Sequence, residues 1–593
     1  MEEMISETPN QERDTWGNGL EFLMSCIAMS VGLGNIWRFP FTALENGGGA
    51  FLIPYLIVLL IVGKPIYYME MLIGQFSSRG SVKVYDFAPI MRGTGYGQML
   101  CTAVVSTYYV SLMALTAHYM YSSLSAELPW ARCRPEWGPN CFNSVLEETS
   151  VNDTALMPSA ELYFIHEVLH ENPDLTDGVG MPDWKLTICL FISWASIVLM
   201  LLKGVKTSGK AAYFLAIFPY VVMLVLLIRA VTLPGAANGI LFFVKPNWGE
   251  LLNPKVWYAA VTQVFFSLSV CFGNIIMYSS YNSFRHNVHR DALIVTSLDT
   301  VTSMLAGCTI FGILGHLAHQ TGTDDVASVV RGGTGLAFVS YPDAIAKFTY
   351  LPQVFSVLFF LMLFVLGIGS NVAMASCMMT VIRDRFPQVK HWQAAVGIAC
   401  VGFCVGTVYV TPGGQAVLNL VDHFGASFIV FFLAIAQMLA ISWIYGLDNF
   451  CRDVRFMLGE KVGHVTRYWR ICWGVVTPIL MVVILIYTLV TLTPLKYAGQ
   501  DYPDYVYAVG WCLAAAGLAQ LPCWAIWALY QQKGQNFLQR LWGALSPQSN
   551  WGPLDDQTRS EWRAFKQLED EKELARGSPR NFWERLKDAL LGQ

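Results

Sequence analysis

Apolar runs recur along almost the whole chain and are separated by short polar stretches. Runs such as residues 186–202, 211–228, 354–368 and 471–492 are close to or above the ~17 to 25 residues that a helix needs to cross a bilayer. The pattern predicts twelve spanning helices. We expect them at residues 18–43, 50–77, 98–127, 184–203, 211–231, 255–282, 291–320, 352–384, 393–411, 417–445, 470–494 and 505–531.

The polar stretches divide the chain into four parts. These are an amino-terminal tail (1–17), a ten-helix core (18–445) with a long outer loop (128–183), helices eleven and twelve (446–531), and a carboxyl-terminal tail (532–593). In the last part, Phe582, Trp583, Leu586 and Leu590 share one face at helical spacing. This face indicates a helix on the membrane surface or on the protein itself, and a partly ordered polar tail is the alternative.

Composition and charge place the protein in a membrane. Hydrophobic residues make up 54% of the chain and charged residues 13%, well below the roughly 25% of soluble domains. Basic residues gather in alternate loops, which predicts that both termini are cytoplasmic and fits a plasma-membrane protein. The net charge of −4 and the lack of a basic patch with interleaved aromatic residues argue against a nucleic-acid partner.

Two of the 14 cysteines differ from the rest. Most cysteines lie in apolar runs and read as small buried hydrophobic residues, whereas Cys133 and Cys141 lie in the long loop after the third helix. The same loop carries Asn152-Asp153-Thr154, a glycosylation acceptor sequence. Because the charge bias places this loop outside, we expect a disulfide between Cys133 and Cys141 and a glycan on Asn152.

Two predicted helices, the first and the sixth, carry helix-breaking residues in their middles, at residues 28–40 and 265–274. Unpaired backbone groups are costly in hydrocarbon, so interrupted helices persist where they line a cavity or bind a ligand. The two breaks lie five helices apart, as in an inverted repeat whose open carbonyls bind cations and whose half-helix amino ends bind an anionic group. Close helix contact through glycine would account for one such segment but poorly for the pair.

Three motifs carry a resemblance to a known family. They are Val31-Gly-Leu-Gly-Asn-Ile-Trp-Arg-Phe-Pro40, Glu45-Asn-Gly-Gly-Gly-Ala-Phe-Leu-Ile-Pro-Tyr55 and Gln263-Val-Phe-Phe-Ser-Leu-Ser269. With them, residues 13–530 resemble the neurotransmitter:sodium symporters, which share the fold of the bacterial leucine transporter. Residues 366–371 look most like the nutrient amino acid transporters of insect gut. The resemblance implies an all-α polytopic membrane protein with a five-plus-five inverted repeat and unwound helices 1 and 6.

The resemblance also implies two sodium sites and a chloride site. The first sodium site would consist of Ser30, Asn35, Ser267 and Asp299. The second would consist of Ala28, Val31, Leu366 and Ser370, and Gly369 offers it no side-chain oxygen. The chloride ligands would be Tyr55, Gln263, Ser267 and Ser303. Chloride-dependent relatives usually carry asparagine at the position of Asp299, so we expect a weak chloride requirement and potassium as a substitute for sodium.

The substrate expected from the resemblance is a neutral amino acid. Amine transporters of the family place an aspartate at the position of Gly32, and glycine leaves space for the substrate's own carboxylate. The apolar walls favour uncharged side chains, because an unpaired polar group is costly to bury. The implied substrate residues are Met29, Ser30, Gly32, Leu33, Gly34, Val105, Tyr109, Phe266, Ser269, Phe272, Asn371 and Met374.

Two charge pairs match the family's gate positions. Arg38 would pair with Asp422 above the site, and Arg13 with Asp384 below it, assisted by Tyr281. Charged residues at such depths are costly unless they are paired, so a role in gating is the default interpretation. For Arg13 the alternative is a solvated charge in a flexible tail.

Three functions compete at this point. Cation-coupled import of neutral L-amino acids by alternating access is the leading one. A glycine, GABA or osmolyte symporter of the same family, and an amino-acid-gated channel or nutrient sensor, are the alternatives. An enzyme is disfavoured, because the sequence has no phosphate-binding loop, metal-ligand cluster or nucleophile motif. The preferred amino acid and the oligomeric state stay open.

Overall fold

The computed structural model describes residues 15–138, 141–143, 157–172, 175–176, 178–202, 204–246, 248–321, 336–348, 351–462, 467–534 and 536–575. Within these residues, ten helices are long and apolar enough to span a membrane. The bent pair Gly19–Ser30 and Gly34–Glu45 makes an eleventh candidate. The protein is therefore a mostly helical, multi-pass membrane protein, as the hydropathy pattern predicts.

The remaining one of the twelve predicted spans is interrupted. It consists of α10 (Pro254–Leu268) and α11 (Asn274–Ser279), of 15 and 6 residues, which are each too short to cross a bilayer alone. The count of twelve thus depends on taking two broken helices as one span each, and it stays a prediction.

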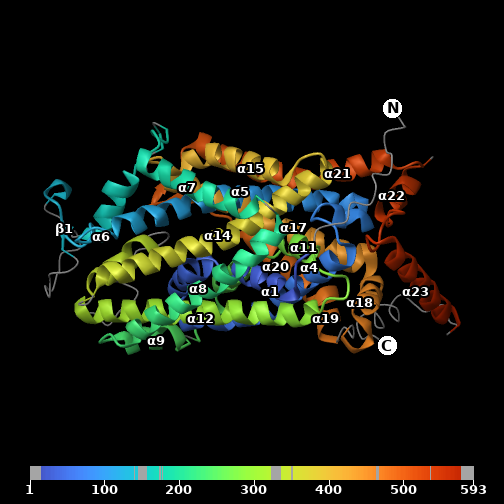
Figure 1. The fold of residues 1–593 in the computed structure, drawn as a ribbon, viewed down its shortest axis with the longest axis horizontal. Coiled ribbons are helices and arrows are strands. Elements are labelled where there is room, and N and C mark those ends of the chain that lie inside the picture. Colours follow the sequence, from blue (N-terminus) through green and yellow to red (C-terminus); the bar gives the residue numbers. More distant parts are fainter. Residues whose placement is uncertain are drawn as a thin grey trace.

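α1 and α11, which belong to the two broken helices, lie in the middle of the bundle in Figure 1, and most of their residues are buried. α1 packs against α8, α12 and α14, and α5 packs against α14, α7 and α21. The central elements are α1 (Gly19–Ser30), η1 (Gly34–Arg38), α2 (Phe39–Glu45), α3 (Gly49–Val58), η2 (Leu59–Gly63), α4 (Lys64–Ser77), α5 (Arg92–Ser122), α12 (Val288–Thr321) and α14 (Pro352–Arg385).

Other helices surround this centre and present apolar side chains outward. On α20, for example, Val483, Ile486 and Val490 are 54%, 56% and 78% exposed. Such a surface is stable only in contact with lipid. The surrounding helices are α7 (Trp184–Leu201), α8 (Val205–Val231), α15 (His391–Gly406), α19 (Arg467–Ile471), α20 (Thr477–Val490) and α21 (Asp504–Gln531). By contrast, α16 (Gly414–Val421) and α17 (Phe428–Leu439) are mostly buried.

At the left-hand end of Figure 1, the loop after α5 forms a small structured cap. Strand β1 (Cys141–Phe142) pairs in parallel with β2 (Met157–Pro158), and α6 (Ser159–Leu162) follows. Cys133 and Cys141 form a disulfide, which confirms the predicted bond. Three further elements are α9 (Ala236–Val244), α13 (Tyr341–Ala346) and the hairpin of β3 (Lys496–Tyr497) and β4 (Gln500–Asp501). Asn152 and Arg13 lie outside the described residues, as does the predicted apolar face at 582–590.

At the opposite end, α18 (Leu447–Val462), α22 (Phe537–Leu545) and α23 (Asp556–Ala575) extend beyond the bundle (Figure 1). The segment between α22 and α23 packs against the connection from α4 to α5. Trp551 is 3% exposed, and its ring lies 5.5 Å from that of Phe87 and 6.0 Å from that of Phe76. The guanidinium of Arg79 donates to the carbonyl oxygen of Asn550.

Several predicted boundaries were wrong, among them the start of the fifth span, which lies at Val205 rather than residue 211. The third span starts at Arg92 rather than residue 98, because Gly93 and Gly95 do not form a loop. A Cβ on Gly93 would clash with the carbonyl oxygen of Gln520, and one on Gly95 would lie 2.5 Å from that of Ser81. These glycines are helical, and they allow close backbone contact. The tenth predicted span ends where the backbone breaks at Gly446, whose φ is 96°, and α18 follows directly without an intervening loop.

Candidate functional site

The first broken helix supplies a gap at the middle of the bundle. α1 ends at Ser30, and the chain continues as η1 from Gly34, with an angle of 44° between the two halves. The Leu33 amide donates to the hydroxyl of Tyr109 on α5 at 2.9 Å. The amino end of η1 therefore lies beside a hydroxyl group, and helix amino ends favour negative charge.

The second break lies between α10 and α11. Ser269, Cys271 and Gly273 have positive φ angles of 53°, 64° and 81°, so the backbone here leaves the helical path. The Glu70 carboxylate on α4 accepts from the Cys271 amide at 2.9 Å, and the Thr102 hydroxyl donates to the Phe272 carbonyl at 2.7 Å. These side chains replace helix hydrogen bonds and hold the unwound segment in place.

A cavity of about 360 Å³ lies between the two breaks. Its walls contain most of the predicted substrate residues: Met29, Ser30, Gly32, Gly34, Val105, Tyr109, Phe266, Ser269, Phe272 and Met374. Towards the outer end it is also lined by Glu45, Gln415 and Tyr497. The cavity thus reaches from the middle of the bundle towards the hairpin of β3 and β4.

Two predicted substrate residues do not line this cavity. Instead, the backbone amide of Leu33 donates a hydrogen bond to the Tyr109 hydroxyl. Asn371 is fully buried, accepts from the Ser106 hydroxyl at 3.2 Å and donates to the Gly367 carbonyl at 3.1 Å. Its amide therefore joins α5 to α14 behind the wall. Leu112, Trp37, Phe41 and Thr42 line the cavity without having been predicted.

Three of the four residues of the predicted first cation site, Asn35, Ser267 and Asp299, are in contact with one another. The Asn35 amide nitrogen lies 2.7 Å from the Asp299 carboxylate and 3.0 Å from the Ser267 hydroxyl. The Ser267 hydroxyl also lies 2.8 Å from Asp299, and Ser30 precedes the break. Asp299 is fully buried, and within the described ranges no basic side chain forms an ion pair with it. A buried carboxylate without a positive partner is costly, so the oxygens of Asp299 and Ser267 fit a bound cation, although the Asn35 amide presents its nitrogen to them.

The predicted second cation site lies where α1 meets α14. The Ser370 hydroxyl donates to the Met29 carbonyl at 3.2 Å. A Cβ on Gly369 would lie 2.5 Å from the carbonyl oxygen of Ala28. Ala28, Val31, Leu366 and Ser370 are all buried. The glycine thus allows the two helices a contact that a larger residue would push apart.

The predicted chloride ligands include unusual buried groups. Within the described residues, the buried Tyr55 hydroxyl and both polar atoms of the buried Gln263 amide form no hydrogen bond of good geometry, and the hydroxyls of Ser267 and Ser303 lie near that of Tyr55. The Ser303 hydroxyl accepts from the Asn35 amide at 2.9 Å, which places it beside the cation cluster. Because nearly all buried polar groups are hydrogen-bonded, the unpartnered donors of Tyr55 and Gln263 fit an anion between them.

The predicted outer gate forms a loose pair above the cavity. Arg38 lies 3.8 Å from Asp422, and both side chains are partly exposed. Its guanidinium lies 3.9 Å from the centre of the Phe266 ring, and the Tyr108 hydroxyl donates to Asp422 at 2.6 Å. The sequence analysis did not predict a role for Tyr108. Its position next to Tyr109 was the only feature of the sequence that could have indicated one. Arginine over an aromatic ring forms a favourable cation–π contact.

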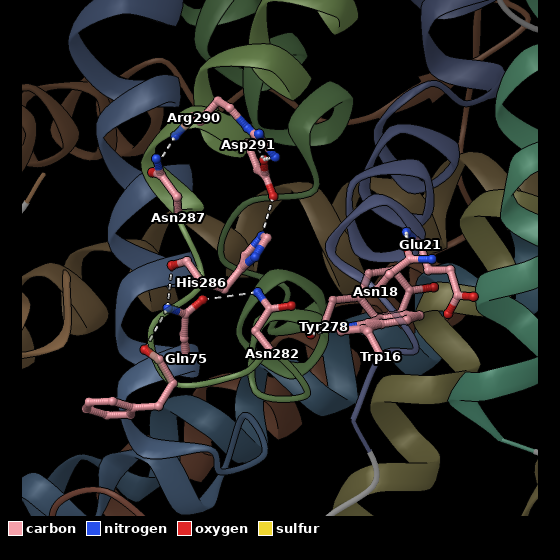
Figure 2. Close-up of polar contacts among 11 residues, drawn as sticks. Trp16, Asn18, Glu21, Gln75, Tyr278, Asn282, His286, Asn287, Arg290 and Asp291 are labelled. Carbon is pink, nitrogen blue, oxygen red and sulfur yellow. Dashed lines mark hydrogen bonds and ion pairs between the residues drawn. The ribbon is translucent and has the colours of Figure 1, made fainter. Parts of the chain in front are cut away.

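On the side of the predicted inner gate, a network of polar contacts joins the start of α1 to α11 and the end of α4 to the start of α12 (Figure 2). The Trp16 indole donates to the Tyr278 carbonyl at 3.0 Å, which ties the start of α1 to α11. Gln75 on α4 donates to the Phe284 and His286 carbonyls, and the His286 ring lies 2.6 Å from the Asp291 carboxylate. Trp16, Gln75, His286 and Asp291 were all missed by the sequence analysis, because single polar residues near helix ends carry no periodic signal.

The predicted inner gate is described only in part. The Tyr281 hydroxyl lies 2.9 Å from the Thr380 hydroxyl, one turn before Asp384 on α14. The Tyr281 carbonyl accepts from the Trp16 amide at 3.1 Å. A Cβ on Gly80 would lie 2.6 Å from the Asp384 carboxylate. Tyr281 therefore links the start of α1 to the α14 end that carries Asp384.

Comparison with known proteins matches residues 13–532 to the sodium:neurotransmitter symporter family. The chain is 54% identical over 582 residues to the sodium-dependent nutrient amino acid transporter 1 of Drosophila virilis, covering 95% of this chain and 91% of that protein. The protein of the same name from Drosophila melanogaster is 53% identical over 588 residues, with the same coverage. That of Drosophila persimilis is 51% identical over 607 residues and covers 99% of this chain and 92% of the relative.

Proposed function

Because this chain belongs to the sodium:neurotransmitter symporter family, we propose that it is a sodium-driven symporter that imports neutral L-amino acids across the plasma membrane. It is a transporter and not an enzyme. The relatives quoted above are named as sodium-dependent nutrient amino acid transporters, which supports the choice of substrate class. The alternating basic loops support cytoplasmic termini.

One observation carries the substrate assignment. The cavity contains Gly32 beside the Tyr109 hydroxyl and the amino end of η1, which together suit a carboxylate. Val105, Phe266, Phe272 and Met374 form walls that suit an uncharged side chain. The proposed substrate lies with its carboxylate at the broken first helix and its side chain against these walls.

The coupling ion would bind next to this carboxylate. Sodium would receive hard oxygen ligands from Ser267, Asp299 and the Ser30 carbonyl, with the substrate carboxylate as another. Asn35 would join them by turning its amide oxygen, which here accepts from the Gly32 amide, towards the ion. Binding of ion and substrate would thus favour each other. Ala28, Val31, Leu366 and Ser370 would hold a second sodium ion, and Tyr55, Gln263, Ser267 and Ser303 would hold chloride. The unpartnered atoms of Tyr55 and Gln263 support the anion site.

Transport would proceed by alternating opening of the two sides. Arg38, Asp422 and Phe266 would close the outer path after binding. When the inner path opens, the Trp16 and Tyr281 contacts would break, and α1 would separate from α11 and α14. Arg13 and Asp384 stay the proposed ion pair of that side.

Uptake into proteoliposomes tests the proposal. We expect labelled leucine, methionine or phenylalanine to accumulate above its outside concentration under an inward sodium gradient. Glycine and GABA should accumulate poorly, because neither has an apolar side chain that fills the space between the cavity walls. Dissipating the sodium gradient is the control. Flux that only ever runs down the amino acid gradient would contradict symport and favour a gated channel, and preferred uptake of glycine or GABA would favour the other substrate class.

Tyr109→Phe should raise the half-saturating substrate concentration by about one to two orders of magnitude. The substitution removes a hydrogen bond to a charged group, worth roughly 1.5 to 3 kcal/mol. The measurement is the concentration dependence of uptake, normalised to surface expression. Tyr121→Phe is the matched control, because Tyr121 lies on the same stretch of chain but is 76% exposed. A normal half-saturating concentration in Tyr109→Phe would place the carboxylate elsewhere.

A further inference from the structure

The short helix α22 has an apolar face that the rest of the described chain leaves uncovered. Phe537, Leu538 and Trp542 are 67%, 65% and 69% exposed, whereas Ala544 is fully buried. At 100° per residue, the three exposed apolar side chains fall within an arc of about 140°, and Gln539 and Arg540 lie outside that arc. The helix is therefore amphipathic, with its apolar face turned away from the protein.

The position of α22 relates this face to the membrane. α21, a spanning helix, ends at Gln531, and α22 starts six residues later at Phe537. Arg540 donates to the Gly534 carbonyl at 2.9 Å, which fixes the turn between the two helices. α22 packs against α21 and against η4 (Pro89–Met91). Figure 1 shows it at the right-hand end of the bundle, close to the end of α21.

The end of α21, against which α22 packs, also exposes large apolar side chains. On the last turns of α21, Ile526, Trp527 and Tyr530 are 66%, 49% and 76% exposed. Tryptophan and tyrosine are common at the boundary between acyl chains and headgroups. A helix of 9 residues extends only about 14 Å, too short to cross a bilayer but long enough to lie in this boundary.

We propose that α22 is a membrane-interface anchor. Phe537, Leu538 and Trp542 insert among the acyl chains of the leaflet at which α21 ends. The exposed side chains of Lys533 and Arg540 lie at headgroup level, where acidic phospholipids attract basic residues. This surface is separate from the substrate and ion sites, and the proposal does not depend on which solute is carried.

The test compares neighbouring positions on the two faces of α22. Leu538→Cys and Gln539→Cys are prepared separately in a background in which the four exposed cysteines, Cys400, Cys404, Cys512 and Cys523, are replaced by serine. Each full-length variant is spin-labelled and placed in nanodiscs of phosphatidylcholine and phosphatidylserine. Collisions with oxygen, which concentrates in lipid, and with a water-soluble nickel chelate are then measured by power saturation. The unlabelled background protein must transport like the wild type.

We expect the label at position 538 to collide several-fold more with oxygen than with the chelate, and the label at position 539 to show the reverse. Two results would overturn the proposal. Equal access of the chelate to both positions would place the helix in water. Low access of both reagents to position 538 would mean that protein covers the apolar face, either residues 576–593 or a second copy of the chain. Repeating the measurement on a chain that ends at residue 575 distinguishes these two covers.

Discussion

Gly32→Asp should abolish amino acid uptake. A Cβ at this position would lie 2.6 Å from the Ser370 hydroxyl and 2.8 Å from that of Tyr109, so any side chain enters the space between them. Aspartate adds a negative charge where the proposed substrate carboxylate binds. Two like charges in a site shielded from water repel each other by several kcal/mol, which corresponds to a loss of more than a thousandfold in affinity.

The measurement for Gly32→Asp is sodium-driven uptake of leucine and phenylalanine at matched surface expression. Gly32→Ala separates the two causes, because it adds the Cβ but no charge. We expect it to retain measurable uptake with a raised half-saturating concentration, since the neighbouring hydroxyl groups can turn. Tyramine or another amine without a carboxylate should compete for binding in Gly32→Asp and not in the wild type. Normal leucine uptake by Gly32→Asp would refute the proposed substrate position.

Asp299→Asn should make transport strictly dependent on sodium and more dependent on chloride. An ionised carboxylate contributes a full charge and up to two oxygen atoms, whereas an amide contributes one partial charge. The carboxylate should therefore hold potassium as well as sodium, because its strong charge outweighs the poorer fit of the larger ion. Asp299 also lies within hydrogen-bond distance of Ser267, a proposed chloride ligand, so its charge competes with the anion.

The comparison uses wild type and Asp299→Asn in sodium or potassium media, with chloride present or replaced by gluconate. We expect potassium to drive uptake in the wild type. In the variant, the rate of potassium-driven uptake should be at least tenfold lower. Removal of chloride should affect the variant more than the wild type. Asp291→Asn is the control, because Asp291 is another buried aspartate of α12 and pairs with His286 away from the cavity. A wild type that strictly requires sodium and chloride, with an unchanged variant, would refute this role of Asp299.

The sequence predicted the fold more completely than the details of the site. Its hydropathy and its two interrupted helices predicted a helical membrane protein with a broken first span, because burial in lipid imposes long apolar runs and makes each interruption conspicuous. The predicted start of the third span at residue 98 was late, because glycines such as Gly93 and Gly95 can either open a loop or permit close helix contact. Only the three-dimensional neighbours, Gln520 and Ser81, distinguish the two cases.

In the site, residues next to the breaks were predictable and residues behind the wall were not. Asn35, Ser267 and Asp299 come from three separate segments, and the structure brings them together as the family motifs implied. Asn371 lies on α14 close to predicted substrate residues, but its side-chain amide forms hydrogen bonds with Ser106 and Gly367 and does not face the cavity. The direction of one side chain depends on its packing partners, which a single sequence does not contain.

The carboxyl-terminal segment after α22 limits how far the protein can be shortened. The Gln548 amide donates to the Asp86 carbonyl at 3.0 Å, and the Trp562 indole and the Lys566 ammonium lie 2.8 Å and 3.2 Å from the Asp453 carboxylate. A chain that ended near residue 546 would expose the apolar surface under Trp551 and leave Asp453 buried without its ammonium partner. For protein engineering, the smallest fragment that keeps the described fold must run through Lys566, so affinity tags belong at the far end of the chain, beyond α23.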